Sequence, residues 1–163
     1  MIAKATIDRI ERAVIRSEIE ALNAEFAYLI DHDLTEQVPD LFTDEGSYGR
    51  NSGERSTGRA ALQAAYAVRA ARGDRTARHI ITNLRLDYKS VTLVHGTCLL
   101  LLFAEDGKPP LPAEVNLVSE YQDIYQRGED EVWRFASRTI TRLFSHPGGK
   151  PLVLPLGLNI DKN

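Results

Sequence analysis

The fold of this 163-residue chain is decided by the stretch Val91-Thr-Leu-Val-His-Gly-Thr-Cys-Leu-Leu-Leu-Leu-Phe-Ala104. Its unbroken apolar second half predicts a long, buried β-strand. Strand-like segments of similar length surround it at residues 76–88, 114–126 and 132–144. The turn Gly128-Glu-Asp-Glu131 joins the last two, and strands joined by such short turns pair in antiparallel fashion. The second half of the chain is therefore expected to be a sheet of long strands.

The first half of the chain reads as helix. Ile15, Ile19, Leu22, Phe26 and Leu29 recur at helical spacing and predict an amphipathic helix with Thr6 or Asp8 as its cap. A short helix capped by Thr35, a short strand at 47–50, a loop at 51–58 and a helix at 59–72 are expected to follow. Helices followed by strands predict an α+β fold. We expect a curled, cone-shaped sheet whose concave side the three helices cover around an apolar pocket.

Composition excludes several classes of function. With 20 Lys and Arg against 23 Asp and Glu, the net charge is −3, so nucleic acid is not an expected partner. The single cysteine, Cys98, forms no intramolecular disulfide, and the longest apolar run is too short to cross a membrane. The N-terminus lacks the apolar segment of a signal peptide, so we expect a cytoplasmic protein. Neither a metal nor a cofactor is expected, because the four histidines lack ligand spacing and no glycine-rich nucleotide loop is present.

The sequence predicts one domain at residues 1–145 and a separate tail at 146–163. The tail is apolar yet rich in proline and glycine, which excludes a helix. Extended packing along its own domain, a cover over the pocket mouth and contact with a partner chain remain open for it.

Two residues at element ends could form a catalytic pair. Asp31 lies at the end of the first helix, close to its apolar stripe, and His79 opens the first long strand. If the helix end lies over the start of that strand, Asp31 can accept a hydrogen bond from His79. An imidazole oriented in this way is a competent general base near neutral pH. The alternative is a surface carboxylate and a histidine of the core.

Six segments of the chain, spread from Tyr28 to Phe135, carry a family resemblance. In chain order they are Tyr28-Leu-Ile-Asp-His-Asp33, Leu41-Phe-Thr-Asp-Glu45, Thr57-Gly-Arg-Ala-Ala-Leu62, Thr76-Ala-Arg-His-Ile-Ile-Thr-Asn83, Tyr121-Gln-Asp-Ile-Tyr-Gln-Arg127 and Val132-Trp-Arg-Phe135. Their order and spacing resemble the SnoaL-like branch of the nuclear transport factor 2-like superfamily, which includes scytalone dehydratase and a bile-acid dehydratase. This fold also hosts binding modules and subunits of larger enzymes.

The resemblance implies a site and a reaction class. Asp31 and His79 fall at the positions of the orienting aspartate and the proton-moving histidine of the dehydratase-like members. Tyr28 and Tyr48 are the candidates for polarising a substrate carbonyl. Asn83 and Asn116 are candidate pocket residues, although hydrogen bonding at a strand edge is an equal alternative for both.

The implied function is a cofactor-free lyase or isomerase acting on a small, cyclic, apolar, ketone-like molecule. The stretch 99–104 lacks the second pocket histidine of scytalone dehydratase, which argues against the same substrate. The alternatives are a non-catalytic ligand-binding or assembly module and the small subunit of a ring-hydroxylating oxygenase. The resemblance also implies a homodimer that pairs through the open face of the sheet.

Overall fold

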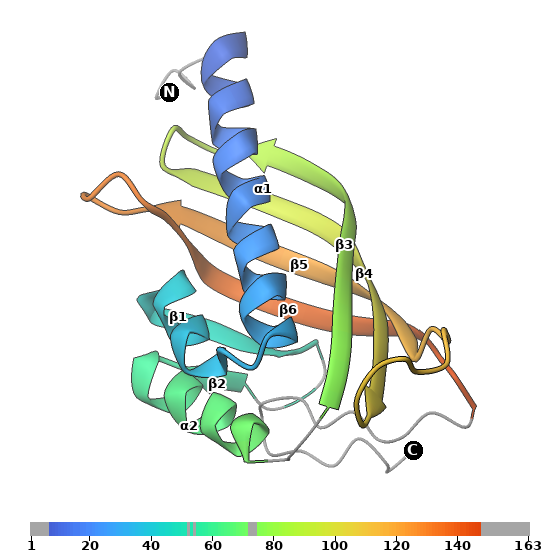
Figure 1. Ribbon diagram of the computed structural model, residues 1–163. Coiled ribbons are helices and arrows are strands. Elements are labelled where there is room, and N and C mark those ends of the chain that lie inside the picture. Colours follow the sequence, from blue (N-terminus) through green and yellow to red (C-terminus); the bar gives the residue numbers. More distant parts are fainter. Residues whose placement is uncertain (1–6, 52, 54, 72–74, 148–163) are drawn as a thin grey trace.

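The computed structural model describes residues 7–51, 53, 55–71 and 75–147 (Figure 1). The predicted tail therefore lies outside the described residues from residue 148 onward. The elements in chain order are α1 (Arg9–Asp31), the 3₁₀ helix η1 (Thr35–Leu41), β1 (Phe42–Arg50), β2 (Arg55–Thr57), α2 (Arg59–Ala70), β3 (Arg75–Tyr88), β4 (Leu93–Asp106), β5 (Leu117–Arg127) and β6 (Trp133–Ser145).

The strands form one open, mixed sheet in the order β2-β1-β6-β5-β4-β3. Strands β3 to β6 pair in antiparallel fashion, as the short turn between β5 and β6 predicts for the last pair, whereas β1 pairs with β6 in parallel. Helix α1 runs along the sheet, and α2 and η1 lie at its β1–β2 end (Figure 1). The predicted α+β cone with an open, curled sheet is confirmed.

Helix α1 follows from its sequence. The Asp8 side chain caps it by accepting a hydrogen bond from the Glu11 amide, which confirms one of the two expected caps. The predicted stripe is buried against the sheet. The chain leaves the helix at His32 and Asp33, and Asp33 has a φ of 59°. This turn makes Asp31 the last residue of the helix.

Two local predictions were wrong. The second helix is a 3₁₀ helix that begins at Thr35, so Thr35 is not its cap, and Leu34 precedes it without a side-chain hydrogen bond. Pro39 lies inside this helix and has no amide hydrogen to donate. The expected loop at 51–58 contains the short strand β2, which pairs with β1.

Strand β3 forms the edge of the sheet and carries a bulge. Its register with β4 is continuous from Arg75 to Thr82 and resumes at Arg85. Asn83, within the bulge, has a φ of 55°, a conformation that asparagine tolerates better than most residues. The bulge bends the edge strand beneath α1, where the pocket described below lies.

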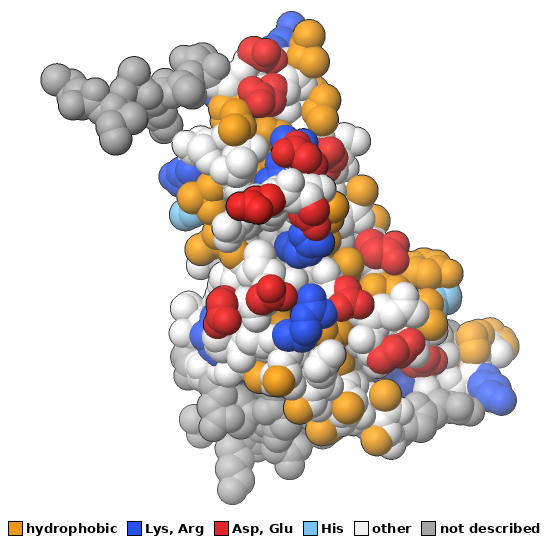
Figure 2. All heavy atoms as spheres, turned by 90° about the vertical axis from the view of Figure 1, so that its left-hand side faces the viewer, with side chains coloured by type: hydrophobic (Ala, Val, Ile, Leu, Met, Phe, Trp, Pro, Cys, Tyr) orange, Lys and Arg blue, Asp and Glu red, His pale blue; other side chains and the backbone are white. Residues whose placement is uncertain are grey.

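Side chains of both charges lie interspersed over the face shown in Figure 2, as expected for a weakly acidic protein. Among the described residues, no helix is long and apolar enough to span a membrane. In the same part of the chain, no group of three or more His, Cys, Asp or Glu side chains is arranged to hold a metal ion.

Candidate active site

The structure brings Asp31 and His79 together. Asp31 Oδ1 lies 2.6 Å from His79 Nδ1, and Asp31 Oδ2 accepts a 2.8 Å hydrogen bond from the His79 amide. Both side chains are less than a tenth exposed. A carboxylate only accepts hydrogen bonds, so Nδ1 carries a proton, and in the neutral ring Nε2 holds the lone pair. This is the tautomer that a general base needs.

The local structure explains why this pair is rigid. Asp31 ends α1, and His79 lies on the face of β3 that faces the helix. The Asp31 carboxylate is hydrogen-bonded to both the ring and the backbone amide of His79. Rotation of the Asp31 or the His79 side chain would therefore break a hydrogen bond. The Arg78 guanidinium adds a 3.3 Å hydrogen bond to the Asp31 carbonyl oxygen.

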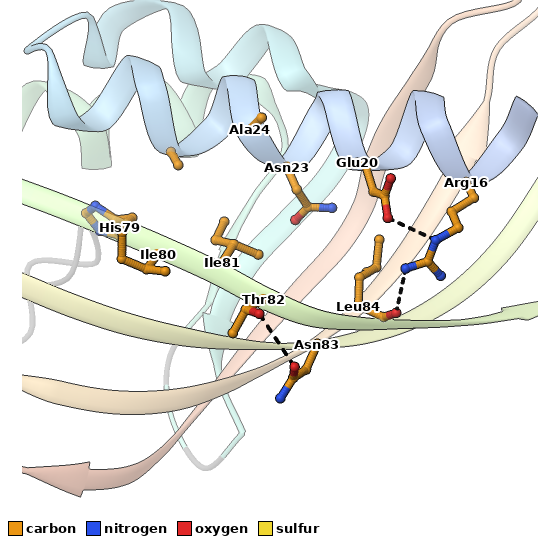
Figure 3. Close-up of a pocket in the computed structure, with 11 residues that line it drawn as sticks. Arg16, Glu20, Asn23, Ala24, His79, Ile80, Ile81, Thr82, Asn83 and Leu84 are labelled. Carbon is orange, nitrogen blue, oxygen red and sulfur yellow. Dashed lines mark hydrogen bonds and ion pairs between the residues drawn. The ribbon is translucent and has the colours of Figure 1, made fainter. Parts of the chain in front are cut away.

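A pocket of about 640 Å³ lies between α1 and β3 (Figure 3). His79 is at one end of its β3 wall, and an ion pair of 2.9 Å between Arg16 and Glu20 lies toward the other end. Its helix wall includes Asn23, Ala24 and Ala27, and its strand wall is formed by residues 79–84. The two alanines have short side chains, which leaves space between helix and strand. The pocket is large enough for a small organic molecule.

Tyr28 does not line this pocket. Its side chain is half exposed, and its ring stacks on the His32 ring at a centroid distance of 4.1 Å. The helical repeat places Tyr28 only about 60° around the helix from Asp31, and the Tyr28 ring is directed to the surface by its stacking on His32. The role of Tyr28 in polarising a substrate carbonyl stays a prediction.

The other three candidates occupy different surroundings. Tyr48 is buried in the core and forms a side-chain hydrogen bond with Tyr121, whose pKa burial raises well above its usual value. Asn83 lines the pocket. The Asn116 side chain accepts a hydrogen bond from the Ala104 amide, which is the strand-edge role that the sequence left open.

Sequence reasoning missed a buried polar network beside the pocket. Arg138 is completely buried and forms two hydrogen bonds with Asp123, of 3.0 and 2.8 Å. It also donates to Asn23, whose amide group donates to Tyr125 at 3.0 Å. The Tyr125 hydroxyl in turn donates to Asp123 at 2.7 Å. Since Asn23 also lines the pocket, this network supports the pocket wall.

The charge of Arg138 is held in an aromatic cage. Its guanidinium carbon lies 4.0, 4.1 and 4.5 Å from the ring centroids of Phe135, Tyr121 and Phe26. Burial alone would lower the pKa of Arg138, but the ion pair and hydrogen bonds with Asp123 raise that pKa above its usual value. The guanidinium therefore stays charged inside the protein.

Comparison with known proteins places the chain in a family. Residues 11–139 match the model of the SnoaL-like domain. The chain belongs to the SnoaL-like family. Its sequence matches no curated protein.

Many solved structures match this chain, and the three described below are distant from it in sequence. A candidate scytalone dehydratase from Novosphingobium aromaticivorans is 19% identical, with a TM-score of 0.76 over 93% of this chain and 99% of that one. ActVI-ORFA from Streptomyces coelicolor is 18% identical, with a TM-score of 0.69 over 78% of this chain and 96% of that one. The β subunit of a candidate aromatic-ring-hydroxylating dioxygenase from N. aromaticivorans is 20% identical, with a TM-score of 0.68 over 83% and 93%.

At these identities the likenesses establish the shared fold, and this fold hosts several unrelated activities. The function of this SnoaL-like chain has to be argued from its own pocket.

Proposed function

We propose that this SnoaL-like protein is a cofactor-free lyase or isomerase of the dehydratase type. Its substrate would be a small, cyclic, apolar, ketone-like molecule. The observation that carries the proposal is the two-point hydrogen bonding of His79 by Asp31 at one end of a 640 Å³ pocket. A non-catalytic binding module does not predict that a carboxylate fixes a histidine tautomer inside the pocket.

In the proposed reaction, His79 Nε2 takes a proton from the carbon next to the carbonyl group. The electrons of the broken C–H bond move onto the carbonyl oxygen and form an enolate. Asp31 stabilises the imidazolium that results. When the next carbon carries a hydroxyl group, the carbonyl re-forms, a C=C bond is made and the hydroxyl leaves with the imidazolium proton as water. In an isomerisation, the same proton returns to a different carbon.

The first step can be tested without knowing the natural substrate. 2-Tetralone is a small, cyclic, apolar ketone, and the exchange of its C1 hydrogens in D₂O can be followed by proton NMR. We expect the wild-type protein to catalyse this exchange and the variant His79→Ala to lose it while keeping its fold. His95, on β4, lies outside the residues that line the pocket, so His95→Ala is the matched control. Normal exchange by His79→Ala would refute the proposed role.

We also propose that two copies of the chain pair through the open face of the sheet. Ile80, Leu101, Val118 and Phe144 are neighbours in register across β3, β4, β5 and β6. This row is apolar, and the Phe144 side chain is 69% exposed in the single chain. Pairing would remove this apolar row from water. Light scattering should give the mass of a dimer for the wild type and of a monomer for Leu101→Glu, and a wild-type monomer would contradict the proposal.

A further inference from the structure

The proposed reaction needs a hydrogen-bond donor for the developing enolate oxygen, and neither predicted tyrosine lines the pocket. Tyr28 lies outside the pocket, and the Tyr48 side chain is bonded to Tyr121 in the core. A donor close to His79 must therefore be sought elsewhere on the pocket wall.

The backbone of β3 offers such a donor because β3 is an edge strand. In an antiparallel ladder, successive residues direct their backbone groups alternately toward the neighbouring strand and away from it. The His79 amide bonds to Asp31 and so points away from β4. Register with β4 is unbroken through Ile80 and Ile81, so the Ile81 amide points to the same side as that of His79. This side faces α1.

The neighbouring groups on this edge are already bonded to side chains of α1. Asp31 accepts from the His79 amide, and Arg16 donates to the Leu84 carbonyl oxygen at 3.2 Å. Ile81 lies between these two points, on the wall that faces the alanines of α1 (Figure 3). The side-chain oxygen of Asn23, on the same wall, already accepts from Arg138, and alanine side chains offer no hydrogen-bond acceptor. A ligand in the pocket is the group placed to accept from Ile81.

We infer that the backbone N–H of Ile81 binds the carbonyl oxygen of the substrate and stabilises the enolate; the inference rests on the proposed function. Alternate residues of a strand are about 6.8 Å apart. His79 as the base and the Ile81 amide as the donor can therefore act on the two ends of one H–C–C=O unit. The base contacts the C–H end and the amide contacts the oxygen end, each at about 3 Å. Backbone amides are effective donors to such oxygens because they are fixed before the charge develops.

Replacing the Ile81 amide with an ester removes this N–H and keeps the side chain. Isoleucine is exchanged for its α-hydroxy acid analogue during synthesis. The ester removes none of the backbone hydrogen bonds between β3 and β4, because the Ile81 amide points away from β4. The matched control is the same exchange at Ala77, whose amide also points away from β4 and which lies outside the residues that line the pocket. Urea unfolding of both esters measures their stability.

The loss of one such donor typically lowers a rate by about 10²-fold or more. We therefore expect the Ile81 ester to lower kcat for 2-tetralone exchange by about 10²-fold with little change in KM. The Ala77 ester should keep the wild-type kcat after correction for its folded fraction. A wild-type kcat for the Ile81 ester would overturn the inference.

A second measurement needs no variant and no activity. 2-Naphthol has the shape of the enol of 2-tetralone, and it can be titrated into ¹⁵N-labelled wild-type protein. The Ile81 amide proton should move downfield as the naphthol oxygen accepts its hydrogen bond. No change at Ile81 on titration would overturn the inference. If His79→Ala still catalyses exchange while the Ile81 amide proton moves downfield as expected, only the proposed function is refuted.

Discussion

The buried ion pair between Arg138 and Asp123 allows a quantitative test of what holds the pocket wall. The variant Asp123→Leu keeps the approximate volume of the side chain but leaves the Arg138 guanidinium without its carboxylate. The variant Arg138→Met leaves the carboxylate without its cation. Both charges are fully buried, so water cannot replace the lost partner.

Breaking a buried ion pair from one side costs about 3–5 kcal/mol, because an uncompensated charge remains. The network justifies the upper half of this range for Asp123→Leu, since the Tyr125 hydroxyl also loses its acceptor. A domain of this kind has a free energy of unfolding of about 5–15 kcal/mol. At about 2–4 °C per kcal/mol, the melting temperature should fall by roughly 6–20 °C. The double variant leaves no unpaired charge, so it should be more stable than the sum of the single effects predicts.

Urea unfolding followed by the fluorescence of Trp133 measures all four proteins. This is the only tryptophan in the sequence, and it is buried in the folded chain. The matched control is Asp87→Asn, which removes an exposed ion pair with Lys89 and should have little effect. Single variants within about 1 kcal/mol of wild type, or a strictly additive double variant, would refute this account of the network.

Three further predictions concern the dyad, the thiol and the hairpin. In the variant Asp31→Asn, the side-chain amide can donate to Nδ1 of His79 and so stabilise the tautomer that has no lone pair on Nε2. The rate of 2-tetralone exchange should then fall by up to about 10⁴-fold in a protein that still folds. An unchanged rate would contradict the role of the Asp31–His79 pair. Burial raises the pKa of Cys98 to about 12, so iodoacetamide at pH 8 should label it only in urea, and rapid labelling of the folded chain would contradict this. The hydrogen bond from Arg134 lowers the pKa of Asp130 to about 2 from 3.8. The stabilisation that the Asp130 carboxylate provides is thus present above pH 3.8 and lost as the pH falls through 2. An NMR titration of the Asp130 carboxyl carbon should have its midpoint near pH 2, and a midpoint near pH 4 would contradict this prediction.

The long elements could be predicted because their hydrophobic periods are regular. The stripe of α1 follows from spacings of three and four residues, and the four long strands follow from alternating apolar residues or, in β4, from an apolar run. Asp31 and His79 could be placed together because each lies at the end of such an element. Their hydrogen bonds then follow from the packing of α1 on β3.

The polar network was missed because a bulge hides it. In β6, Phe135 pairs with Tyr125 while Ser137 pairs with Ile124, so one residue is extra at this point. Strict alternation from Trp133 would direct Arg138 to the outer face, but the extra residue shifts its side chain into the core. Asn23 adjoins polar residues of α1 in the sequence, a context typical of a solvent-facing position, although its side chain is only 4% exposed. Sequence periodicity cannot reveal a polar core residue whose partner lies on a bulged strand.

The parallel pairing of β1 with β6 has a consequence for synthesis on the ribosome. Arg50 pairs with Ile140, so about half of the chain must be made between the two partners. At roughly 5–20 residues per second, β1 has no inner neighbour for several seconds after it leaves the ribosome. Such distant contacts slow folding and expose a strand edge to other nascent chains. A fragment that stops before β6 should therefore aggregate, and chaperone dependence should end only when the last strand has emerged.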